Sequence, residues 1–331
     1  MIKKKYLFVS FGSISERHII NLKKLYPNSL IGVLRLSNIY IKKKINVDFI
    51  FHNLDEALSF KPSAVFVCSP ANTHIKIASI FAKKNIPIFI EKPLSTNLVG
   101  LNFFLERIQK NKIPLMVGYN LKFMESFIKL KHFIDKQKVG NILSVISEVG
   151  QYLPYWRPEK DYSKTVSAQN KLGGGAILEL SHEIDYICYL FGIPNFIFAS
   201  GGKVSNLKID VEDIVDLSLI YDSPKKIINI HMDFLQRDYI RKCKIIGSKG
   251  TLIWDLSSGS IDLSTQKKRK NIFKLRNKNQ DIRQSYLSEI KYFIKNLNKF
   301  DSLRINHDKN VLKVLVAAKK SLKSRKLIKI N

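Results

Sequence analysis

Short apolar runs alternate with amphipathic stretches through the first 120 residues of the chain. In the amphipathic stretches the apolar residues recur at helical spacing, as Ile14, Ile19 and Leu22 do in the first of them. The apolar runs have the length of buried strands and lie at residues 6–10, 30–34, 49–51, 64–68, 86–90 and 114–120. Strands that alternate with helices are typical of a parallel, doubly wound sheet with both faces covered. The pattern therefore predicts an α/β fold for residues 1–120.

The pattern changes from residue 121, where a helical stretch over residues 124–137 leads into the alternating stretch GNILSVISEVGQY. Further candidate strands follow at Phe196–Ser200, Asp213–Tyr221, Lys226–Met232, Lys242–Ile246 and Thr251–Leu256. Their close spacing and the turn signals DSPK, GSKG and SSGS predict an open, mainly antiparallel sheet. We expect a loose connection at residues 267–280 and amphipathic helices near 283–298 and 307–323. These elements form a predicted second, α+β domain over residues 121–331, whose last helix is free to pack back on the first domain.

Polar clusters stand at the carboxyl ends of the predicted parallel strands: SFGSIS, Arg35, SPANTH, EKPLS and GYN. Ligands of doubly wound sheets bind beyond these ends, so we expect the clusters to converge. The first cluster resembles the dinucleotide fingerprint G-x-G-x-x-G, with Ser10, Gly12 and Ser15 at its glycine positions. Gly12 permits the close approach of a pyrophosphate. Ser13 and Ile14, at the start of the following helix, offer their backbone amides to it. We predict a Rossmann-type dinucleotide-binding domain; the alternative is a plain strand–turn–helix.

The residue after the second predicted strand is Arg35, and Ser37 follows it closely. In dinucleotide-binding folds an acid at this place binds the ribose 2′-hydroxyl, whereas an arginine accommodates a 2′-phosphate. The sequence therefore favours NADP over NAD as the cofactor. The alternative is an ordinary surface arginine in a very basic protein.

The stretch Leu172–Gly192, LGGGAILELSHEIDYICYLFG, joins three glycines to one continuous helical pattern. One side of this predicted helix is apolar and carries Ile177, Leu180, Ile184, Ile187, Cys188 and Phe191. The other side carries Glu179, His182, Glu183 and Tyr186, which are groups that can move or hold protons. Glycines at 173–175 can take positive φ and let a backbone or ligand come close. A hinge followed by a helix with ordinary surface acids is the alternative.

Composition is that of a folded protein of 331 residues with 45% apolar and 11% aromatic residues. No run approaches the roughly eighteen apolar residues of a membrane span. The start, MIKKKYLFVSFG, has too short an apolar run and no cleavage site for a signal peptide, so we interpret it as a first strand. Three widely spaced cysteines predict neither a metal site nor a disulfide framework, which favours a cytoplasmic protein.

The formal charge of +29 raises the question of a nucleic-acid partner. However, the lysines are scattered along the whole chain, greatly outnumber the arginines and accompany many Ile and Asn residues, a pattern that codon bias also produces. The sequence contains no nucleic-acid recognition motif. We therefore expect no nucleic-acid partner, and a positive field that attracts an anionic substrate or cofactor.

Several motifs together carry a resemblance to a known family. They are SPANTH at 69–74, EKPLS at 91–95, VGYN at 117–120 and GGGAILELSHEID at 173–185. In this order they resemble the glucose–fructose oxidoreductase / inositol dehydrogenase / MocA (Gfo/Idh/MocA) family of nicotinamide-dependent sugar oxidoreductases. YWRPEKDYSKTVSAQNKLGGG and IIGSKGTLIWDL resemble a branch found in surface-polysaccharide and nonulosonic-acid sugar loci. The match covers essentially the whole chain.

The resemblance implies catalytic residues at Lys92 and His182. Family members often carry an Asp four residues before the histidine, whereas this chain has Glu179 three residues before it, and Asp185 is a rival. The resemblance and the strand-end rule together predict cofactor contacts from Ser10, Gly12, Ser13, Ile14, Arg35, Ser37, Ser69, Pro70, Asn72, His74, Glu91 and Lys92. Family members commonly form dimers or tetramers through the open face of the second sheet, so a homo-oligomer is expected.

The chemistry expected is oxidation of a secondary alcohol of a sugar or sugar derivative, including nucleotide sugars and sialic-type sugars. His182 would take the hydroxyl proton, and Lys92 would stabilise the alkoxide. Substrate contacts are expected from Tyr119, Asn120, Tyr152, Trp156 and Arg157. The alternatives are a redox-assisted lyase or dehydratase and a cofactor-binding regulator without turnover, which the serines at positions 10 and 15 favour.

Overall fold

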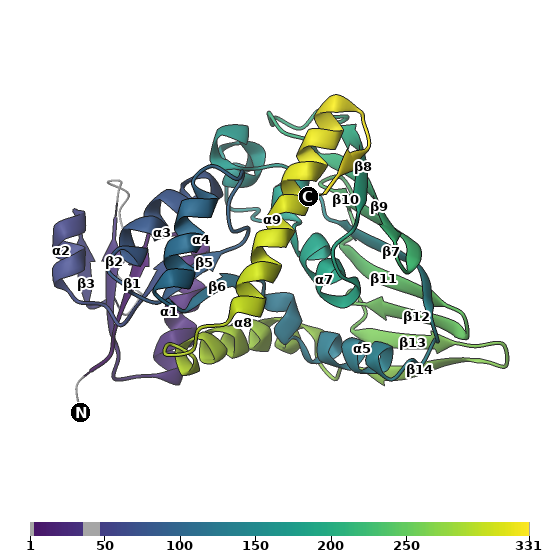
Figure 1. The fold of residues 1–331 in the computed structure, drawn as a ribbon, viewed down its shortest axis with the longest axis horizontal. Helices are drawn as coiled ribbons and strands as arrows, with labels where there is room; N and C mark the ends of the chain where they lie inside the picture. Colours follow the sequence, from purple (N-terminus) through teal and green to yellow (C-terminus); the bar gives the residue numbers. More distant parts are fainter. Residues whose placement is uncertain (1–2, 36–46, 331) are drawn as a thin grey trace. The chain divides into compact units, whose positions relative to one another are not determined.

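The computed structural model describes residues 3–35 and 47–330 (Figure 1). The chain forms two compact units. The first unit consists of Met1–Asn120 with Tyr286–Lys309, and the second of Leu121–Ser285 with Asn310–Asn331. Each unit contains one sheet.

The first unit is built on a six-stranded parallel sheet in the order β3-β2-β1-β4-β5-β6. The strands are β1 (Lys5–Val9), β2 (Leu30–Leu34), β3 (Phe49–Phe51), β4 (Ala64–Val67), β5 (Ile88–Glu91) and β6 (Leu115–Gly118). Each corresponds to one of the six predicted strands, and the doubly wound parallel sheet is confirmed. Strand order reverses beside β1, which makes the ends of β1 and β4 the topological switch point of this sheet.

Helices with one apolar face cover this sheet. They are α1 (Ser13–Leu25), α2 (Leu54–Ser59), α3 (His74–Ala82), which follows the short helix η1 (Ala71–Thr73), and α4 (Leu101–Lys110). Helix α3 packs on β4 and β5, and α4 lies beside α3 (Figure 1). The buried face of α4 holds Leu101, Phe104, Leu105 and Ile108, the spacing expected of an amphipathic helix.

The register of the parallel strands brings their carboxyl ends level. Val9 pairs with Leu34 on one side and with Val67 on the other. Across the rest of the sheet Val67 pairs with Ile90, and Glu91 pairs with Gly118. The polar clusters that follow β1, β2, β4, β5 and β6 therefore start along one edge, as predicted.

The second unit contains a nine-stranded sheet in the order β14-β13-β12-β11-β7-β10-β9-β8-β15. Its strands are β7 (Ile142–Gly150), β8 (Phe196–Gly202), β9 (Ile214–Asp222), β10 (Lys225–Asp233), β11 (Ile240–Gly247), β12 (Gly250–Asp255), β13 (Ser260–Ser264), β14 (Arg269–Lys274) and β15 (Ile328–Lys329). All pairs are antiparallel except β7 with β10, so the mainly antiparallel sheet is confirmed. The expectation of a loose connection at residues 267–280 was wrong, because the lysine-rich segment supplies β14, an edge strand whose exposed side chains suit lysine.

The helices of the second unit lie against its sheet. They are α5 (Glu125–Asp135), α6 (Ala176–Glu179) and α7 (His182–Phe191); α8 (Lys278–Lys295) and α9 (Ser302–Ser324) each have residues in both units. Helix α7 packs on β7, and α6 packs on β9 and β10. The single helix predicted after the glycines is in fact α6 and α7, separated at Leu180 and Ser181. Three residues of the expected polar side, His182, Glu183 and Tyr186, are also buried; within the unit Glu183 pairs with Arg241, and Tyr186 hydrogen-bonds Ser147.

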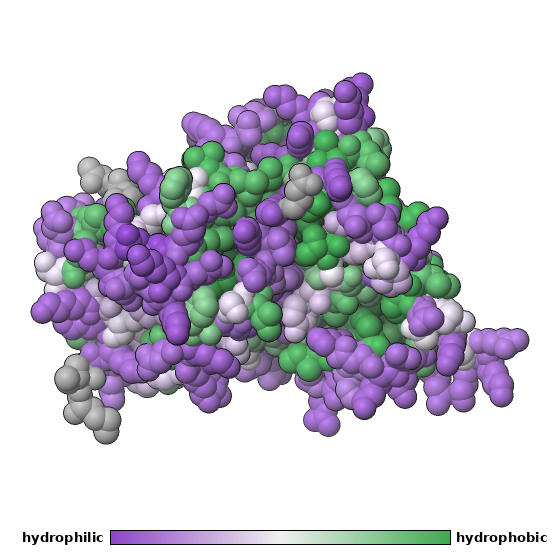
Figure 2. Space-filling model, in the orientation of Figure 1, coloured by the Kyte–Doolittle hydropathy of each residue, from purple (hydrophilic) through white to green (hydrophobic). Residues whose placement is uncertain are grey.

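On the face shown in Figure 2, hydrophilic residues are spread widely rather than gathered into one patch. This agrees with the scattered lysines of the sequence. Among the residues that the structure describes, no helix has the length and apolar character to cross a membrane.

Candidate cofactor and active-site residues

The turn after β1 forms without the outer two glycines of the fingerprint. Ser10 has φ 73°, a left-handed conformation that favours glycine and costs other residues roughly 1–2 kcal/mol. Its N–H donates to the Leu34 carbonyl at 3.0 Å. The buried Ser15 hydroxyl donates to the Ser10 carbonyl at 3.1 Å. The two serines thus hold each other in the geometry for which the fingerprint uses glycine.

Gly12 has the surroundings of a ligand-facing position. Its backbone is extended, with φ −142°, so any residue could adopt it. Among the residues that the structure describes, a Cβ added at Gly12 would have no atom within 4 Å, so neither its conformation nor the packing of those residues requires glycine there. Helix α1 begins at the next residue, and no side chain of residues 3–35 or 47–330 caps it. Open space beside uncapped helix amides fits the pyrophosphate of a dinucleotide.

The remaining predicted cofactor residues of the first unit lie along the same sheet edge. Arg35 is half-buried at the end of β2, and its N–H donates to the Phe51 carbonyl at 2.9 Å. Ser37 lies outside the described residues. After β4, Ser69 hydrogen-bonds Thr73 at 2.7 Å. Pro70 is the N-cap residue of η1, and Asn72 lies within η1.

His74 contacts two loops, the one after β4 and the one after β5. It is buried, with Nε2 2.8 Å from the Ser69 carbonyl and Nδ1 2.9 Å from the Pro93 carbonyl. Burial lowers the pKa of His74 below its ordinary value, although both hydrogen bonds oppose the shift. The ring therefore lies between the SPANTH and EKPLS loops, and in its neutral form it donates to one of the two carbonyls, depending on the tautomer.

Lys92 directly follows β5, and its side chain is half-buried. The preceding Glu91 is buried, and its carboxylate pairs with the imidazole of His18 on α1. The second oxygen of Glu91 accepts the Lys92 N–H at 3.2 Å. The peptide bond between Lys92 and Pro93 is cis. At the next strand end Tyr119 and Asn120 are also buried.

In the second unit, the predicted catalytic residues surround the start of α7. His182 is the first residue of this helix and is buried. One oxygen of Glu179 accepts a hydrogen bond from Ser167 at 2.8 Å. Asp185 forms a buried ion pair with Lys122, at 2.8 Å. Glu179 and Asp185 are therefore held in different ways: one by a hydroxyl and the other by a cation.

The predicted substrate residues of the second unit fall into two groups. Tyr152 stacks under the guanidinium of Arg237, which lies 3.6 Å from the ring centre. Trp156 donates to the Gln151 carbonyl at 3.1 Å. Trp156 and Arg157 line a pocket with Leu153, Tyr162, Thr165 and Ser167. Because Ser167 bonds Glu179, this pocket adjoins α6.

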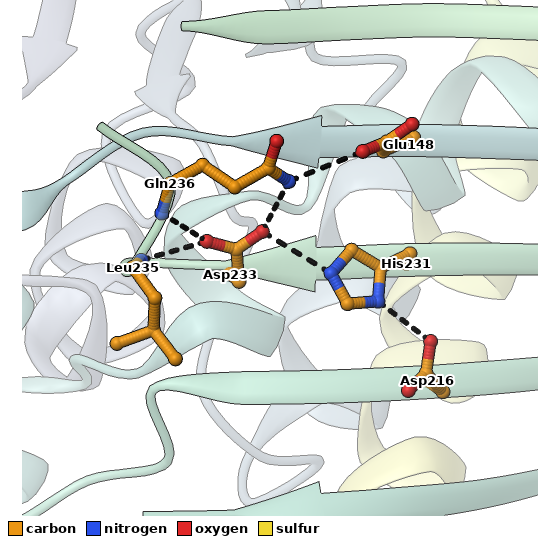
Figure 3. A network of polar contacts seen from close by, with 6 residues as sticks. All are labelled: Glu148, Asp216, His231, Asp233, Leu235 and Gln236. Carbon is orange, nitrogen blue, oxygen red and sulfur yellow. Dashed lines mark hydrogen bonds and ion pairs between the residues drawn. The ribbon is translucent and has the colours of Figure 1, made fainter. Parts of the chain in front are cut away.

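Two buried or half-buried histidine networks were not predicted from the sequence. One is the His18–Glu91 pair. The other, on β9 and β10, places His231 between Asp216, at 2.7 Å, and Asp233, at 3.1 Å (Figure 3). Hydrogen bonding to Asp233 and then to Asp216 raises the pKa of His231 to about 9. Period-two alternation puts His231 on the outer face of the sheet, but no pattern in the sequence pairs it with Asp216.

Fold and site together define a two-unit protein with a dinucleotide-binding Rossmann sheet and a second, mainly antiparallel sheet. Residues 4–119 match the family model of the oxidoreductase family with an NAD-binding Rossmann fold, and residues 127–253 match the GFO/IDH/MocA C-terminal domain. The chain belongs to the Gfo/Idh/MocA family of oxidoreductases.

Among the similar proteins are inositol dehydrogenases, one of which matches almost the whole chain. Myo-inositol 2-dehydrogenase of Thermotoga maritima is 27% identical over 339 residues, covering 98% of this chain and 97% of the relative. An NADP(+) scyllo-inositol 2-dehydrogenase of Bacillus subtilis is 25% identical, covering 64% of this chain and 63% of the relative. The crystal structure of scyllo-inositol dehydrogenase from Lactobacillus casei with bound NAD(H) and scyllo-inositol has a TM-score of 0.80 at 18% identity, covering 99% of each chain.

Proposed function

We propose that the protein is an NAD(P)-dependent dehydrogenase that oxidises a ring secondary alcohol of a cyclic polyol such as an inositol. One observation carries the proposal: the similarity to a myo-inositol 2-dehydrogenase extends over 98% of the chain. The open space at Gly12, beside the uncapped start of α1, supports the cofactor part of the proposal. The surface-polysaccharide and nonulosonic-acid branch stays a prediction. The relatives named above are inositol dehydrogenases and do not support that branch.

The reaction requires a base for the hydroxyl proton and a cation for the developing alkoxide, while the bound nicotinamide supplies hydride chemistry. His182 is the proposed base, since an imidazole has a suitable proton affinity near neutral pH. Lys92 is the proposed alkoxide partner. The proposed substrate contacts are Tyr119, Asn120, Tyr152, Trp156 and Arg157.

Glu179 and Asp185 are rival candidates for the acid that orients His182. Asp185 has a cationic partner in Lys122, whereas Glu179 binds Ser167, which lines the pocket of Trp156 and Arg157. We favour Glu179, because its partner Ser167 lies beside Trp156 and Arg157, two of the proposed substrate contacts. Glu179→Gln is expected to lower kcat more than Asp185→Asn does; the reverse order assigns the orienting acid to Asp185.

The test is turnover of myo-inositol and scyllo-inositol with NAD and with NADP. Lys92→Ala and His182→Ala are each expected to lower kcat about 10²- to 10⁴-fold. Lys76→Ala and His132→Ala remove exposed residues of the same types from the same units and serve as matched controls. Near-full turnover by either active-site variant would reject the proposed chemistry.

Cofactor choice is a separate part of the proposal. Arg35 at the end of β2 favours NADP, since a guanidinium binds a 2′-phosphate. We expect a lower dissociation constant for NADP than for NAD, with the preference reduced in Arg35→Ala. Tighter binding of NAD by the wild-type protein rejects this role for Arg35.

The other reactions considered give different results in the same assay. A redox-assisted lyase or dehydratase forms product without net reduction of the cofactor. A regulator binds NAD(P) without turnover of any substrate, and a dehydrogenase of nucleotide or sialic-type sugars turns over those sugars but no inositol. Each of these outcomes contradicts the inositol proposal.

A homo-oligomer, a dimer or a tetramer, is also proposed. The outer face of the second sheet carries Ile146, Phe198 and Ile227, which are 42%, 39% and 47% exposed. Large apolar side chains exposed on one sheet face often mark protein interfaces. Light scattering after size exclusion is expected to give a multiple of the 38.2 kDa chain mass. Ile227→Lys is expected to shift this mass toward the monomer, and a monomeric wild-type protein rejects the proposal.

A further inference from the structure

Two buried histidines from different helices hold the short segment that carries Lys92. His18 comes from α1 and pairs with the carboxylate of Glu91, the residue before Lys92. His74 comes from the start of α3, and its Nδ1 lies 2.9 Å from the carbonyl of Pro93, the residue after Lys92. Both imidazoles are almost fully buried, at 0% and 1% exposure. The backbone on either side of Lys92 is therefore tied to the helices of the first unit.

Two groups bind the Glu91 carboxylate, and a glycine on the neighbouring strand leaves room for it. His18 on α1 binds one oxygen, and the Lys92 N–H donates to the other at 3.2 Å. Gly118, at the end of β6, leaves room for it: a Cβ there would lie 3.2 Å from Glu91 Oε1 and 2.9 Å from the Phe89 ring. A buried carboxylate held in this way transmits the position of α1 to the Lys92 peptide.

The second tie joins two strand ends. His74 contacts the Ser69 carbonyl after β4 and the Pro93 carbonyl after β5. Since α1 begins at the proposed pyrophosphate site and α3 follows the SPANTH loop, both ties start from elements that would contact the cofactor.

We infer that His18 and His74 are positioning residues for Lys92, and that they set its place relative to the dinucleotide. This inference rests on the catalytic role proposed for Lys92. The two residues act through Glu91 and Pro93 and do not touch the reacting atoms.

The test uses paired variants that remove or restore one nitrogen. His18→Phe keeps a ring but removes the partner of Glu91, and His18→Gln returns a nitrogen donor at similar reach. His74→Leu removes both contacts. His74→Asn returns a donor near the Nδ1 position that faces Pro93, and His74→Gln returns one near the Nε2 position that faces Ser69. Ile108→Val, in the buried face of α4, is the control for general destabilisation.

We expect His18→Phe and His74→Leu to lower kcat about 10- to 100-fold, with the dissociation constant of the cofactor changed less than about threefold. His18→Gln and His74→Asn are expected to recover most of kcat, and His74→Gln to recover little. Hydrogen–deuterium exchange of residues 88–96 is expected to rise in the two disruptive variants only. The Ile108→Val variant is expected to lower the melting temperature without changing kcat or this local exchange.

Unchanged kcat and unchanged local exchange in the disruptive variants overturn the inference. Rescue by His74→Gln instead of His74→Asn overturns the tie through Pro93. The exchange measurement needs no substrate, so it tests the two ties even if the wild-type enzyme oxidises no polyol. In that case the proposed function fails separately from the positioning of Lys92.

Discussion

The turn after β1 and the glycine segment before α6 use glycine for different reasons. At Gly12 an added Cβ would meet no atom of the described part of the chain within 4 Å. At Gly174 it would collide with the Val166 carbonyl oxygen and lie 2.6 Å from the Ser167 carbonyl oxygen. The first glycine therefore leaves room for a ligand, whereas the second lets two parts of the backbone pack together.

The polar residues of the turn after β1 and those of α7, which follows the glycine segment and α6, also differ. In the turn after β1, Ser15 binds Ser10, five residues away, and the start of α1 stays uncapped. In α7, Glu183 and Asp185 are buried and bind Arg241 and Lys122, which are distant in the chain. Substitution of Gly12 should therefore change ligand binding, whereas substitution of Gly174 or of a partner in these buried ion pairs should change the free energy of unfolding.

Removal of one partner of a buried ion pair should have the largest effect. Arg241 contacts Glu183 through Nε at 2.8 Å and Nη2 at 3.2 Å, and the Glu183 side chain is fully buried. Arg241→Met leaves this carboxylate without its cation and is expected to lower the free energy of unfolding by about 3–5 kcal/mol in urea titrations. Arg269→Met, in an exposed bridge to Asp262, should cost less than about 1 kcal/mol. Equal losses in the two variants would contradict the comparison.

Gly174→Ala should cause the next largest loss of stability. The new Cβ meets backbone atoms, which cannot swing away as a side chain can. We expect a loss of about 3 kcal/mol, the upper end for overpacking, measured by the same urea titration. A stability close to that of the wild-type protein would mean that the segment before α6 is loosely packed.

Gly12→Ala should spare stability and weaken cofactor binding. The extended φ and the open surroundings accept a methyl group, so the free energy of unfolding should change by less than about 0.5 kcal/mol. The methyl group would occupy the proposed pyrophosphate space, and the dissociation constants of NAD and NADP should rise about tenfold, or about 1.4 kcal/mol. Calorimetric titration measures both constants. An unchanged affinity would place the pyrophosphate elsewhere.

The half-exposed His231 network should have the smallest effect. Hydrogen bonds to Asp233 and Asp216 raise the pKa of His231 from 6.5 to about 9, so folding favours the protonated ring. Its stabilising contribution should be complete below pH 6.5 and should disappear as the pH rises through about 9. The difference in melting temperature between wild type and His231→Gln should therefore shrink over this pH range. A difference that grows with pH would contradict the sign of the shift.

The strands and the loops that follow them were predictable because they depend on local patterns. The apolar runs identified all six parallel strands, and parallel strand ends necessarily meet at one edge. Helix α7 was harder to predict. Its polar residues have helical spacing, which predicted a polar side of one helix. In the structure Glu183 pairs with Arg241 on β11, and Asp185 pairs with Lys122 in the short segment after β6.

The parallel sheet, the family of the chain and the types of residue at the strand ends can be predicted from the sequence. They follow from periodicity and from short motifs, which act over a few neighbouring residues. Which polar groups are buried together became evident only in the folded chain: His18 with Glu91, His74 with Pro93, and Glu183 with Arg241. Such pairs join residues 19 to 73 positions apart, and their contact depends on how the strands and helices pack rather than on any local pattern.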